Sequence, residues 1–253
     1  MSKSNTLRIV QLFPLEMNIY GDNGNAQILS YRARLYGYNI ELKAYQTSAD
    51  EDILRSADIV LGGGGQDSGQ RAILDELDLA KPTILDLAHD KTPMLMVCGL
   101  YQLFGHYFQT SSGEKLAGIG LFDIITKATD QRLIGNIQLD SDQFGGLVGY
   151  ENHSGITKLA NNQASLGRVV MGYGNDETGS HEGAVRYGVV GTYLHGPILA
   201  KNPVLADWLL SRAVERKKGD TKLVASNDET AKILKKLNRQ IELARQVAYL
   251  RPQ

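Results

Sequence analysis

The sequence contains only one cysteine, Cys98, and no long hydrophobic segment. A single thiol excludes a disulfide within the chain, and it also excludes a structural zinc site built from several cysteines. No apolar run approaches the roughly 18 residues that a membrane span requires. The first residues are polar and lack the apolar stretch of a secretory signal. We therefore expect a cytoplasmic protein with no direct membrane span.

An excess of charge of one sign is also missing, because 27 lysines and arginines stand against 28 aspartates and glutamates in 253 residues. This balance gives no general reason to expect nucleic acid or an anionic membrane surface as the main partner. The sequence has neither a Gly-x-x-x-x-Gly-Lys phosphate loop nor a pair of histidines at the helical spacing of a metal site. We therefore predict no metal site and no cofactor in this chain.

The first half of the sequence alternates short apolar segments with segments of helical periodicity. The predicted strands are residues 7–13, 38–44, 57–61 and 93–97, and the predicted helices are 23–36, 67–79, 83–89 and 99–108. Lys81-Pro82 is expected to break the helical stretch between residues 67 and 89. Strands that alternate with helices predict βαβ units and a buried, mostly parallel sheet.

The second half is richer in glycine, asparagine and short β-like segments. The predicted strands are residues 120–126, 134–139, 146–150, 168–171 and 185–193. No sharp change of composition marks a domain boundary, so these strands are expected to extend the same sheet, some of them antiparallel. A helix is predicted over 202–216, and a last helix is predicted to begin at the capping box Ser226-x-x-Glu229.

Cys98 follows the apolar segment 93–97 and precedes Gly99 and a predicted helix. Functional groups of parallel α/β sheets gather at the carboxyl ends of the strands, and a nucleophile on a strand-to-helix turn stands exposed above the sheet. The amino end of the helix favours a thiolate, and its N–H groups can stabilise an oxyanion. The context therefore favours a catalytic cysteine over the buried structural cysteine that is otherwise common.

A thiolate nucleophile needs a base, which is usually histidine. Of the five histidines, His153 and His195 are the better candidates, and His195 closes the predicted strand 189–194. Strand-end placement puts His195 at the functional edge of the sheet. The run Gly62–Gly65 follows another predicted strand, and its backbone can approach a ligand and direct N–H groups at an anion. A flexible turn is the alternative interpretation of these glycines.

Three segments follow one another in the order expected of a known family: a strand with a glycine-rich loop, a strand with Cys98-Gly99-Leu100-Tyr101-Gln102, and a strand with His195-Gly196-Pro197. They resemble the class I glutamine amidotransferases, specifically their cobyric-acid-synthase-like branch. The segments 18–25, 149–153 and 191–199 narrow the resemblance to glutaminase subunits that serve the amidation of lipid II in Gram-positive bacteria. The resemblance extends from about residue 7 to about residue 216.

The resemblance implies a flavodoxin-like α/β fold, with a mostly parallel sheet flanked by helices and some antiparallel strands in the second half. It implies a glutamine amidotransferase domain over residues 1–216. Residues 217–253 are then expected to form a helical extension packed on or beside that domain.

The family also implies roles for individual residues. Cys98 would attack the side-chain amide of L-glutamine, and His195 would pass a proton to the leaving ammonia, so that a glutamyl thioester forms and is hydrolysed. Arg132 matches the arginine that holds the substrate, and a guanidinium suits an α-carboxylate. Further substrate contacts are expected at Gly63, Gly64, Gly99 and Gln102.

The resemblance implies a partner as well. The ammonia would pass to a Mur-ligase-like synthetase of the MurT type in a heterodimer. That partner would bind ATP and Mg²⁺ and would convert the D-glutamate of lipid II to D-isoglutamine. Because this chain has no phosphate loop, the ATP-dependent step is expected in the partner.

The sequence departs from the family pattern at two positions. Many class I amidotransferases have glutamate two residues after the catalytic histidine, whereas this sequence has Pro197. Either a Cys–His dyad suffices or another acid orients His195. Asp22 and Glu151 are the candidate acids, and Asp22 is favoured because its loop is expected at the same edge of the sheet. The nucleophile motif usually has glycine where this sequence has Leu100, which leaves the oxyanion geometry open.

Three other functions remain open from the sequence alone. One is the same glutaminase chemistry with another acceptor, for example a cobyrinate-type amidation. Another is a non-catalytic flavodoxin-like binding subunit, in which the thiol would be buried and inert. The third is a different cysteine hydrolase, whose activity would not depend on glutamine.

Overall fold

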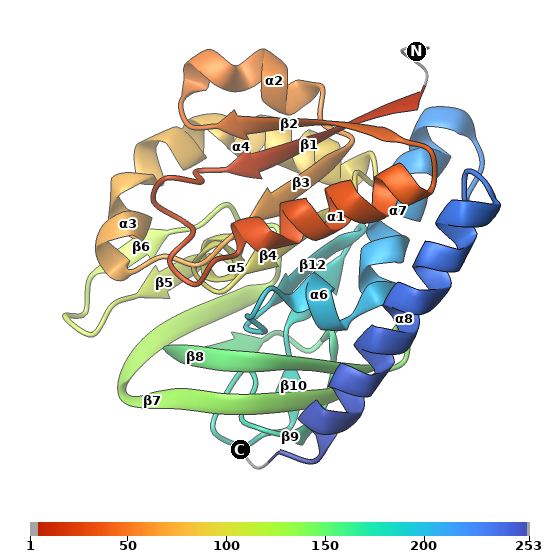
Figure 1. Ribbon diagram of the computed structural model, residues 1–253. Coiled ribbons are helices and arrows are strands. Elements are labelled where there is room, and N and C mark those ends of the chain that lie inside the picture. Colours follow the sequence, from red (N-terminus) through yellow and green to blue (C-terminus); the bar gives the residue numbers. More distant parts are fainter. Residues whose placement is uncertain (1–4, 252–253) are drawn as a thin grey trace.

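A computed structural model describes residues 5–251 and places two β-sheets one beside the other, with helices around the first (Figure 1). In spatial order, the first sheet consists of β11 (Ala184–Arg186), β12 (Val189–Thr192), β4 (Met94–Val97), β3 (Ile59–Gly62), β1 (Thr6–Leu12) and β2 (Asn39–Tyr45). All neighbours in this sheet are parallel except β11 and β12. The prediction of an α/β fold with a mostly parallel sheet is confirmed.

The central strands β3 and β4 are covered on both faces. All four residues of each strand are buried, and their continuous apolar sequences suit a sheet with helices on both sides. The helices are α1 (Asn23–Leu35), α2 (Glu51–Arg55, preceded by a 3₁₀ turn over Ser48–Asp50), α3 (Asp67–Ala72), α4 (Leu74–His89), α5 (Gly99–Leu103), α6 (Ile198–Lys201), α7 (Pro203–Lys218) and α8 (Asp228–Tyr249). Figure 1 shows α1 and α4 on opposite sides of the first sheet.

Most strands of the second half form a separate sheet instead of extending the first, which corrects the prediction. This sheet consists of β10 (His181–Glu182), β9 (Gly167–Met171), β7 (Ile124–Ser141), β5 (Tyr107–Gln109) and β6 (Lys115–Ala117), and β8 (Gly145–Leu159) also pairs with β7. The long antiparallel hairpin of β7 and β8 dominates it (Figure 1). Only β11 and β12 join the first sheet, and a turn at Tyr187-Gly188, both with positive φ, separates them.

Two helix predictions were also wrong in extent. The helix predicted over 99–108 ends at Leu103, and residues 107–109 form β5 instead. The helices predicted over 67–79 and 83–89 are divided at a different place, because α4 continues through Pro82 and the break between α3 and α4 falls at Ile73. Pro82 is exposed while Ala80, Thr83 and Ile84 on the same helix are buried, so packing against the sheet maintains the helix across the proline.

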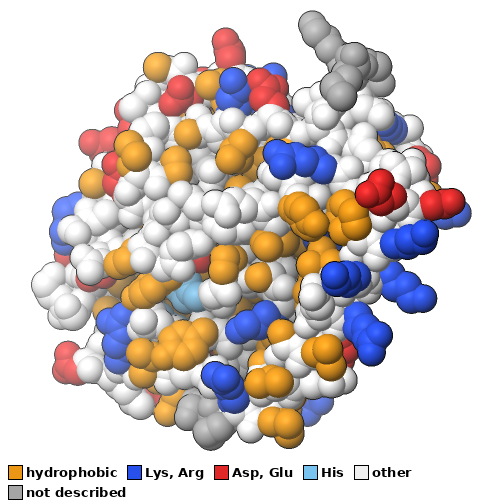
Figure 2. Space-filling model, in the orientation of Figure 1, with side chains coloured by type: hydrophobic (Ala, Val, Ile, Leu, Met, Phe, Trp, Pro, Cys, Tyr) orange, Lys and Arg blue, Asp and Glu red, His pale blue; other side chains and the backbone are white. Residues whose placement is uncertain are grey.

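The C-terminal helix α8 lies along one edge of the molecule and contacts α1, α6 and β8 (Figure 1). Its capping box is shifted by one residue from the prediction, because Asn227 is the N-cap and exchanges hydrogen bonds with Thr230. Figure 2 shows lysine and arginine side chains gathered along this edge. Among residues 5–251, none of the helices combines the length and apolar composition that a bilayer crossing needs.

Arg32 joins three helices from a buried position. Its side chain is 1% exposed and its Nε donates to Asp207 of α7 at 2.7 Å, while its Nη1 donates to Asn238 of α8 at 3.0 Å. Tyr36 at the end of α1 donates to the same aspartate at 2.9 Å. The guanidinium therefore fixes the positions of α7 and α8 relative to α1.

We expect Arg32→Met to lower the free energy of unfolding by about 3 kcal/mol, because the loss leaves Asp207 without its main partner. The exposed pair of Arg168 and Asp140 provides a control, since its side chains are 69% and 58% exposed. Arg168→Met is expected to change stability by less than about 1 kcal/mol. Urea unfolding of both variants measures the difference, and equal losses would contradict the assigned role of Arg32.

Candidate active site

Cys98 occupies a strained turn between β4 and α5. Its φ and ψ are 51° and −105°, values that a residue with a side chain rarely adopts. Its N–H donates to the carbonyl of Thr192 in β12 at 2.8 Å, and its carbonyl accepts from Gln102 at 3.0 Å. Neighbouring elements therefore hold the turn, and such strain is common where a nucleophile is presented to substrate.

His195 approaches Cys98 from the adjacent strand of the sheet. It lies three residues beyond β12, which pairs directly with β4, and its backbone bridges to Tyr150 of β8. Its Nδ1 lies 3.3 Å from Oδ1 of Asp22, and the side chains of both residues are almost fully buried. Asp22, in the loop after β1, also accepts the N–H of Gly64 through Oδ2 at 2.8 Å.

Gly64 shows how closely these side chains surround the glycine loop. A methyl group added to Gly64 would lie 3.1 Å from Cε1 of His195, 3.2 Å from Cβ of Cys98 and 3.5 Å from Oδ2 of Asp22. The predicted nucleophile, base and orienting acid are therefore brought together around one backbone atom. A glycine is needed there because a side chain would occupy the space between them.

The charges of the cluster favour protonation of His195. Burial by itself would lower the pKa of this imidazole, but hydrogen bonds and charge interactions with Asp22 and Cys98 raise the pKa to about 10. A protonated imidazole can donate a proton beside the Cys98 sulfur. The arrangement thus supplies both a nucleophile and a proton donor.

Asp22, and not Glu151, is the acid that contacts His195. Glu151 is fully buried in β8, where its carboxylate accepts N–H groups of Tyr173 and Gly174, each at 2.8 Å. Its nearest imidazole is that of His153, at 3.8 Å. Of the two acids that the sequence offered, Asp22 is the one that contacts His195 in the structure.

A cavity of about 370 Å³ opens beside Cys98. Arg132 stands at its wall, where Nε donates to Asn152 at 2.5 Å and Nη2 donates to the Tyr20 hydroxyl at 2.8 Å. The Tyr20 ring in turn packs edge-on against His195, with the ring centres 4.5 Å apart. The cavity therefore joins the thiol to a guanidinium, although the two lie on different sheets.

The other predicted substrate contacts divide into two groups. Gln102 lines the cavity, accepting from Gln70 at 2.9 Å and donating to the Tyr193 hydroxyl at 3.1 Å. The N–H of Gly64 is already donated to Asp22, the carbonyl of Gly63 accepts from Leu100, and neither glycine is among the residues that line the cavity. Their position instead reflects close packing around the site.

The neighbouring glycines offer a better place for an oxyanion. Gly65 lines the cavity, and a methyl group on Gly99 would lie 3.0 Å from the Gly65 nitrogen. The backbone of Gly65 thus packs against Gly99, the residue that follows Cys98. Leu100, the departure from the family motif, is fully buried against Gly62 and does not line the cavity.

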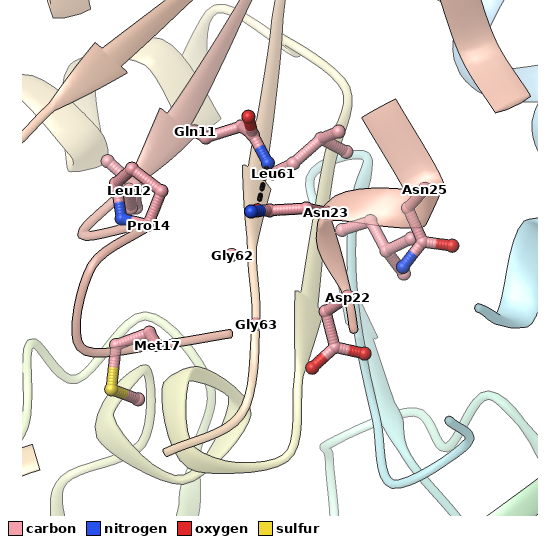
Figure 3. A pocket seen from close by; sticks show the side chains of 11 residues that line it. Gln11, Leu12, Pro14, Met17, Asp22, Asn23, Asn25, Leu61, Gly62 and Gly63 are labelled. Carbon is pink, nitrogen blue, oxygen red and sulfur yellow. Dashed lines mark hydrogen bonds between the residues drawn. The ribbon is translucent and has the colours of Figure 1, made fainter. Parts of the chain in front are cut away.

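A second, very small cavity lies on the inner side of Asp22. Its volume is about 10 Å³, and Figure 3 shows Gln11, Asn23 and Asn25 around it together with Asp22. Gln11 donates to Asn23 across it at 2.6 Å. This space holds at most about one water molecule. The substrate-sized space is therefore on the Cys98 side.

The sequence did not identify every residue that lines the larger cavity. Tyr20 and Asn152 lie within the segments that carried the family resemblance, but their contacts with Arg132 could not be read from their spacing. Gln70 in α3 gave no signal at all, because a single glutamine in a helix has no characteristic pattern. Within residues 5–251, no group of three or more His, Cys, Asp or Glu side chains is placed to hold a metal ion.

Glu182 is a buried carboxyl whose ionisation is coupled to this region. Burial raises its pKa to about 8 against the lowering effect of hydrogen bonds from Tyr193 and Thr192. The folded state therefore keeps a proton that the unfolded chain loses near pH 4.5. Its contribution to stability is complete below that pH and is lost as the pH rises through about 8.

We accordingly expect the free energy of unfolding to fall more steeply with pH in the wild type than in Glu182→Gln. Denaturant unfolding between pH 5 and 8 measures the difference in the free energy of unfolding between wild type and Glu182→Gln. This difference should change by up to about 1.4 kcal/mol per pH unit. A difference that stays constant over this range would show that Glu182 is already ionised in the folded protein.

Comparison with known proteins identifies the class of the fold and site. Residues 8–203 match the CobB/CobQ-like glutamine amidotransferase domain, and the chain belongs to this family. A solved structure described as a glutamine amidotransferase has the same fold, with a TM-score of 0.59, 14% identity, and coverage of 81% of this chain and 98% of that one. The predicted class I glutamine amidotransferase fold is confirmed.

Two relatives that match over most of their length indicate a narrower group within the family. The protein named lipid II isoglutaminyl synthase (glutamine-hydrolyzing) subunit GatD of Staphylococcus aureus (strain N315) is 38% identical over 212 residues, which cover 83% of this chain and 86% of the relative. The protein of the same name from Streptococcus pneumoniae (strain ATCC BAA-255 / R6) is 38% identical over 225 residues, covering 88% and 86%. The resemblance inferred from the sequence is thereby confirmed.

Proposed function

We propose that this chain is the glutaminase subunit of a lipid II isoglutaminyl synthase and acts in the cytoplasm. It would hydrolyse L-glutamine to L-glutamate and ammonia for a partner that amidates the D-glutamate of lipid II. The observation that carries the proposal is the cluster of Cys98, His195 and Asp22 around Gly64, at the wall of a cavity that also contains Arg132. The two GatD relatives support the choice of acceptor.

The chemistry would proceed in two steps. The Cys98 thiolate attacks the side-chain carbonyl carbon of glutamine, and the His195 imidazolium gives its proton to the amide nitrogen as the C–N bond breaks. Ammonia leaves and a glutamyl thioester remains. Water then attacks the thioester while His195 takes up its proton, and cleavage of the C–S bond releases glutamate and restores the thiolate. The amides of Gly65 and Gly99 would stabilise the oxyanion in both steps.

Substrate selection would depend on the far wall of the cavity. Arg132 is held by Tyr20 and Asn152, and its guanidinium can bind the α-carboxylate of glutamine through two parallel hydrogen bonds. The orienting contact of Asp22 keeps Nε2 of His195 directed away from the acid. Gln102 is fixed by Gln70 and Tyr193 and would bound the substrate's side chain.

The amidation itself requires a partner. We propose a Mur-ligase-like synthetase of the MurT type, which would bind ATP and Mg²⁺ and activate the α-carboxyl of D-glutamate in a heterodimer with this chain. The absence of a phosphate loop from the sequence supports this division of labour. No cofactor is proposed for the glutaminase subunit.

Isotope transfer tests the whole proposal. The chain is purified from its own cells, the co-purifying synthetase is identified by mass, and the complex is given lipid II, ATP, Mg²⁺ and glutamine labelled with ¹⁵N in the amide. We expect ¹⁵N in the D-isoglutamine of the product. The complex with Cys98→Ala should incorporate no label from glutamine but should still amidate lipid II with free ammonium.

The alternative acceptor has a distinct outcome in this experiment. Cobyric acid synthases are also related, but the one from Methanothermobacter thermautotrophicus (strain ATCC 29096 / DSM 1053 / JCM 10044 / NBRC 100330 / Delta H) is 34% identical over only 127 residues, or 25% of its length. A co-purifying synthetase that transfers the ¹⁵N label to a cobyrinate-type acceptor would refute the lipid II assignment. Unlabelled product with an inert thiol would instead support a binding subunit.

A further inference from the structure

His153 lines the same cavity and carries a buried ring nitrogen that forms no hydrogen bond within residues 5–251. The side chain is 2% exposed, and no group in the part of the chain that the structure describes forms a hydrogen bond with its buried Nε2. The residue lines the cavity together with Cys98, Gln102 and Arg132. A buried polar atom without a partner is costly, and at the wall of a binding cavity it marks a position where a ligand supplies the missing hydrogen bond.

The rest of the His153 ring is firmly held. Nδ1 lies 2.9 Å from the carbonyl oxygen of Gly155, and because a carbonyl only accepts, Nδ1 carries the proton. The ring stacks on Tyr193 at a centroid distance of 3.6 Å and an interplanar angle of 6°. Tyr193 is itself fixed by hydrogen bonds with Gln102 and Thr157. In this tautomer Nε2 is an acceptor, so the missing partner is a donor.

The charge behind the ring indicates which kind of donor fits. Oε2 of Glu151 lies 3.8 Å from Nε2, too far for a hydrogen bond, and the carboxylate is already satisfied by two backbone N–H groups. A buried carboxylate at that distance makes the position favourable for a cation. Glutamine has two groups with N–H donors, the α-ammonium and the side-chain amide, and only the first is charged.

We infer that Nε2 of His153 accepts a hydrogen bond from the α-ammonium group of the substrate. This inference rests on the proposed hydrolysis of glutamine. It divides recognition of the amino-acid end between two sites, with Arg132 binding the α-carboxylate and His153, supported by Glu151, binding the α-ammonium. Substrates that carry the same amide but no amino group would then lose this part of their binding.

The test combines three variants with two substrates in the purified complex. His153→Phe keeps a flat ring on Tyr193 and removes the acceptor, whereas His153→Gln restores an acceptor near the position of Nε2. We expect His153→Phe to raise KM for glutamine about 10- to 100-fold with kcat within about 3-fold, and His153→Gln to recover part of the loss. His89→Phe is the control, because His89 pairs with the Tyr187 ring outside the cavity.

The second substrate is 4-carbamoylbutanoate, which is glutamine without its amino group. We expect wild type and His153→Phe to have the same KM for this compound. If His153→Phe raised KM for 4-carbamoylbutanoate as much as KM for glutamine, the side-chain amide would be the donor. If His153→Phe left KM for glutamine unchanged, His153 would not contact the substrate. Either result overturns the inference. If the wild-type complex releases no glutamate from glutamine, the proposed function itself is wrong.

A measurement without a His153 substitution covers the case in which His153→Phe does not fold. In ¹⁵N-histidine-labelled Cys98→Ala protein, the unprotonated Nε2 of His153 has a distinct NMR signal. We expect this signal to shift when glutamine is added and to stay in place with 4-carbamoylbutanoate. A signal that responds equally to both compounds, or to neither, would contradict the inference.

Discussion

Replacing Cys98 by alanine is expected to reduce glutamine hydrolysis by at least about 10⁴-fold, because no other thiol is available to form the thioester. His195→Ala should cause a loss of similar size, since the leaving ammonia then lacks its proton donor. The two residues act as one unit. We therefore expect the double variant to be no less active than either single variant, which steady-state release of glutamate can measure.

The fold should survive these changes. The Cys98 side chain packs in a turn that is held by backbone hydrogen bonds to Thr192 and Gln102, and alanine preserves both. The thermal unfolding midpoint and the ammonium-dependent activity of the partner provide the controls. Glutamine hydrolysis that remains within about tenfold of wild type in a folded Cys98→Ala protein would refute the thioester mechanism.

Asp22→Asn is expected to lower kcat by about 10³- to 10⁴-fold with a smaller effect on KM. The carboxylate receives Nδ1 of His195 and the N–H of Gly64, and it stabilises the imidazolium. An amide cannot accept at both positions without placing its own NH₂ group against one of these donors. The imidazole then loses its orientation and the charge that keeps it protonated.

Two comparisons make this prediction specific. Asp123 pairs with His106 at 2.9 Å on the surface, so Asp123→Asn removes a similar contact outside the site and should leave hydrolysis unchanged. Glu151→Gln should reduce kcat far less than Asp22→Asn, because Glu151 does not contact His195. A larger kcat loss in Glu151→Gln than in Asp22→Asn would assign the orienting role to Glu151 instead.

Much of the first sheet could be predicted because its signals are local. An apolar segment that ends in Cys98 or shortly before His195 can be recognised from neighbouring residues, and parallel sheets place such ends at a common edge. Pro82 shows the limit of this reasoning, since the proline predicts a break that buried neighbours on the same helix override. The segment 107–109 shows it too, since these residues follow a five-residue helix and pair with β6 and β7.

The sequence by itself determined the family, and it predicted Cys98 and His195 as the catalytic pair, with Asp22 or Glu151 as the candidate acid. Only the tertiary structure decided which of these two acids contacts His195, since Asp22 lies 173 positions from His195 along the chain. It also decided that Arg132 of the second sheet lines the same cavity as Cys98, and that Nε2 of His153 has no hydrogen-bond partner among residues 5–251. The periodicity that predicts strands and helices is set by residues close together in the sequence. These contacts instead depend on how distant segments pack against each other, so no short sequence pattern predicts them.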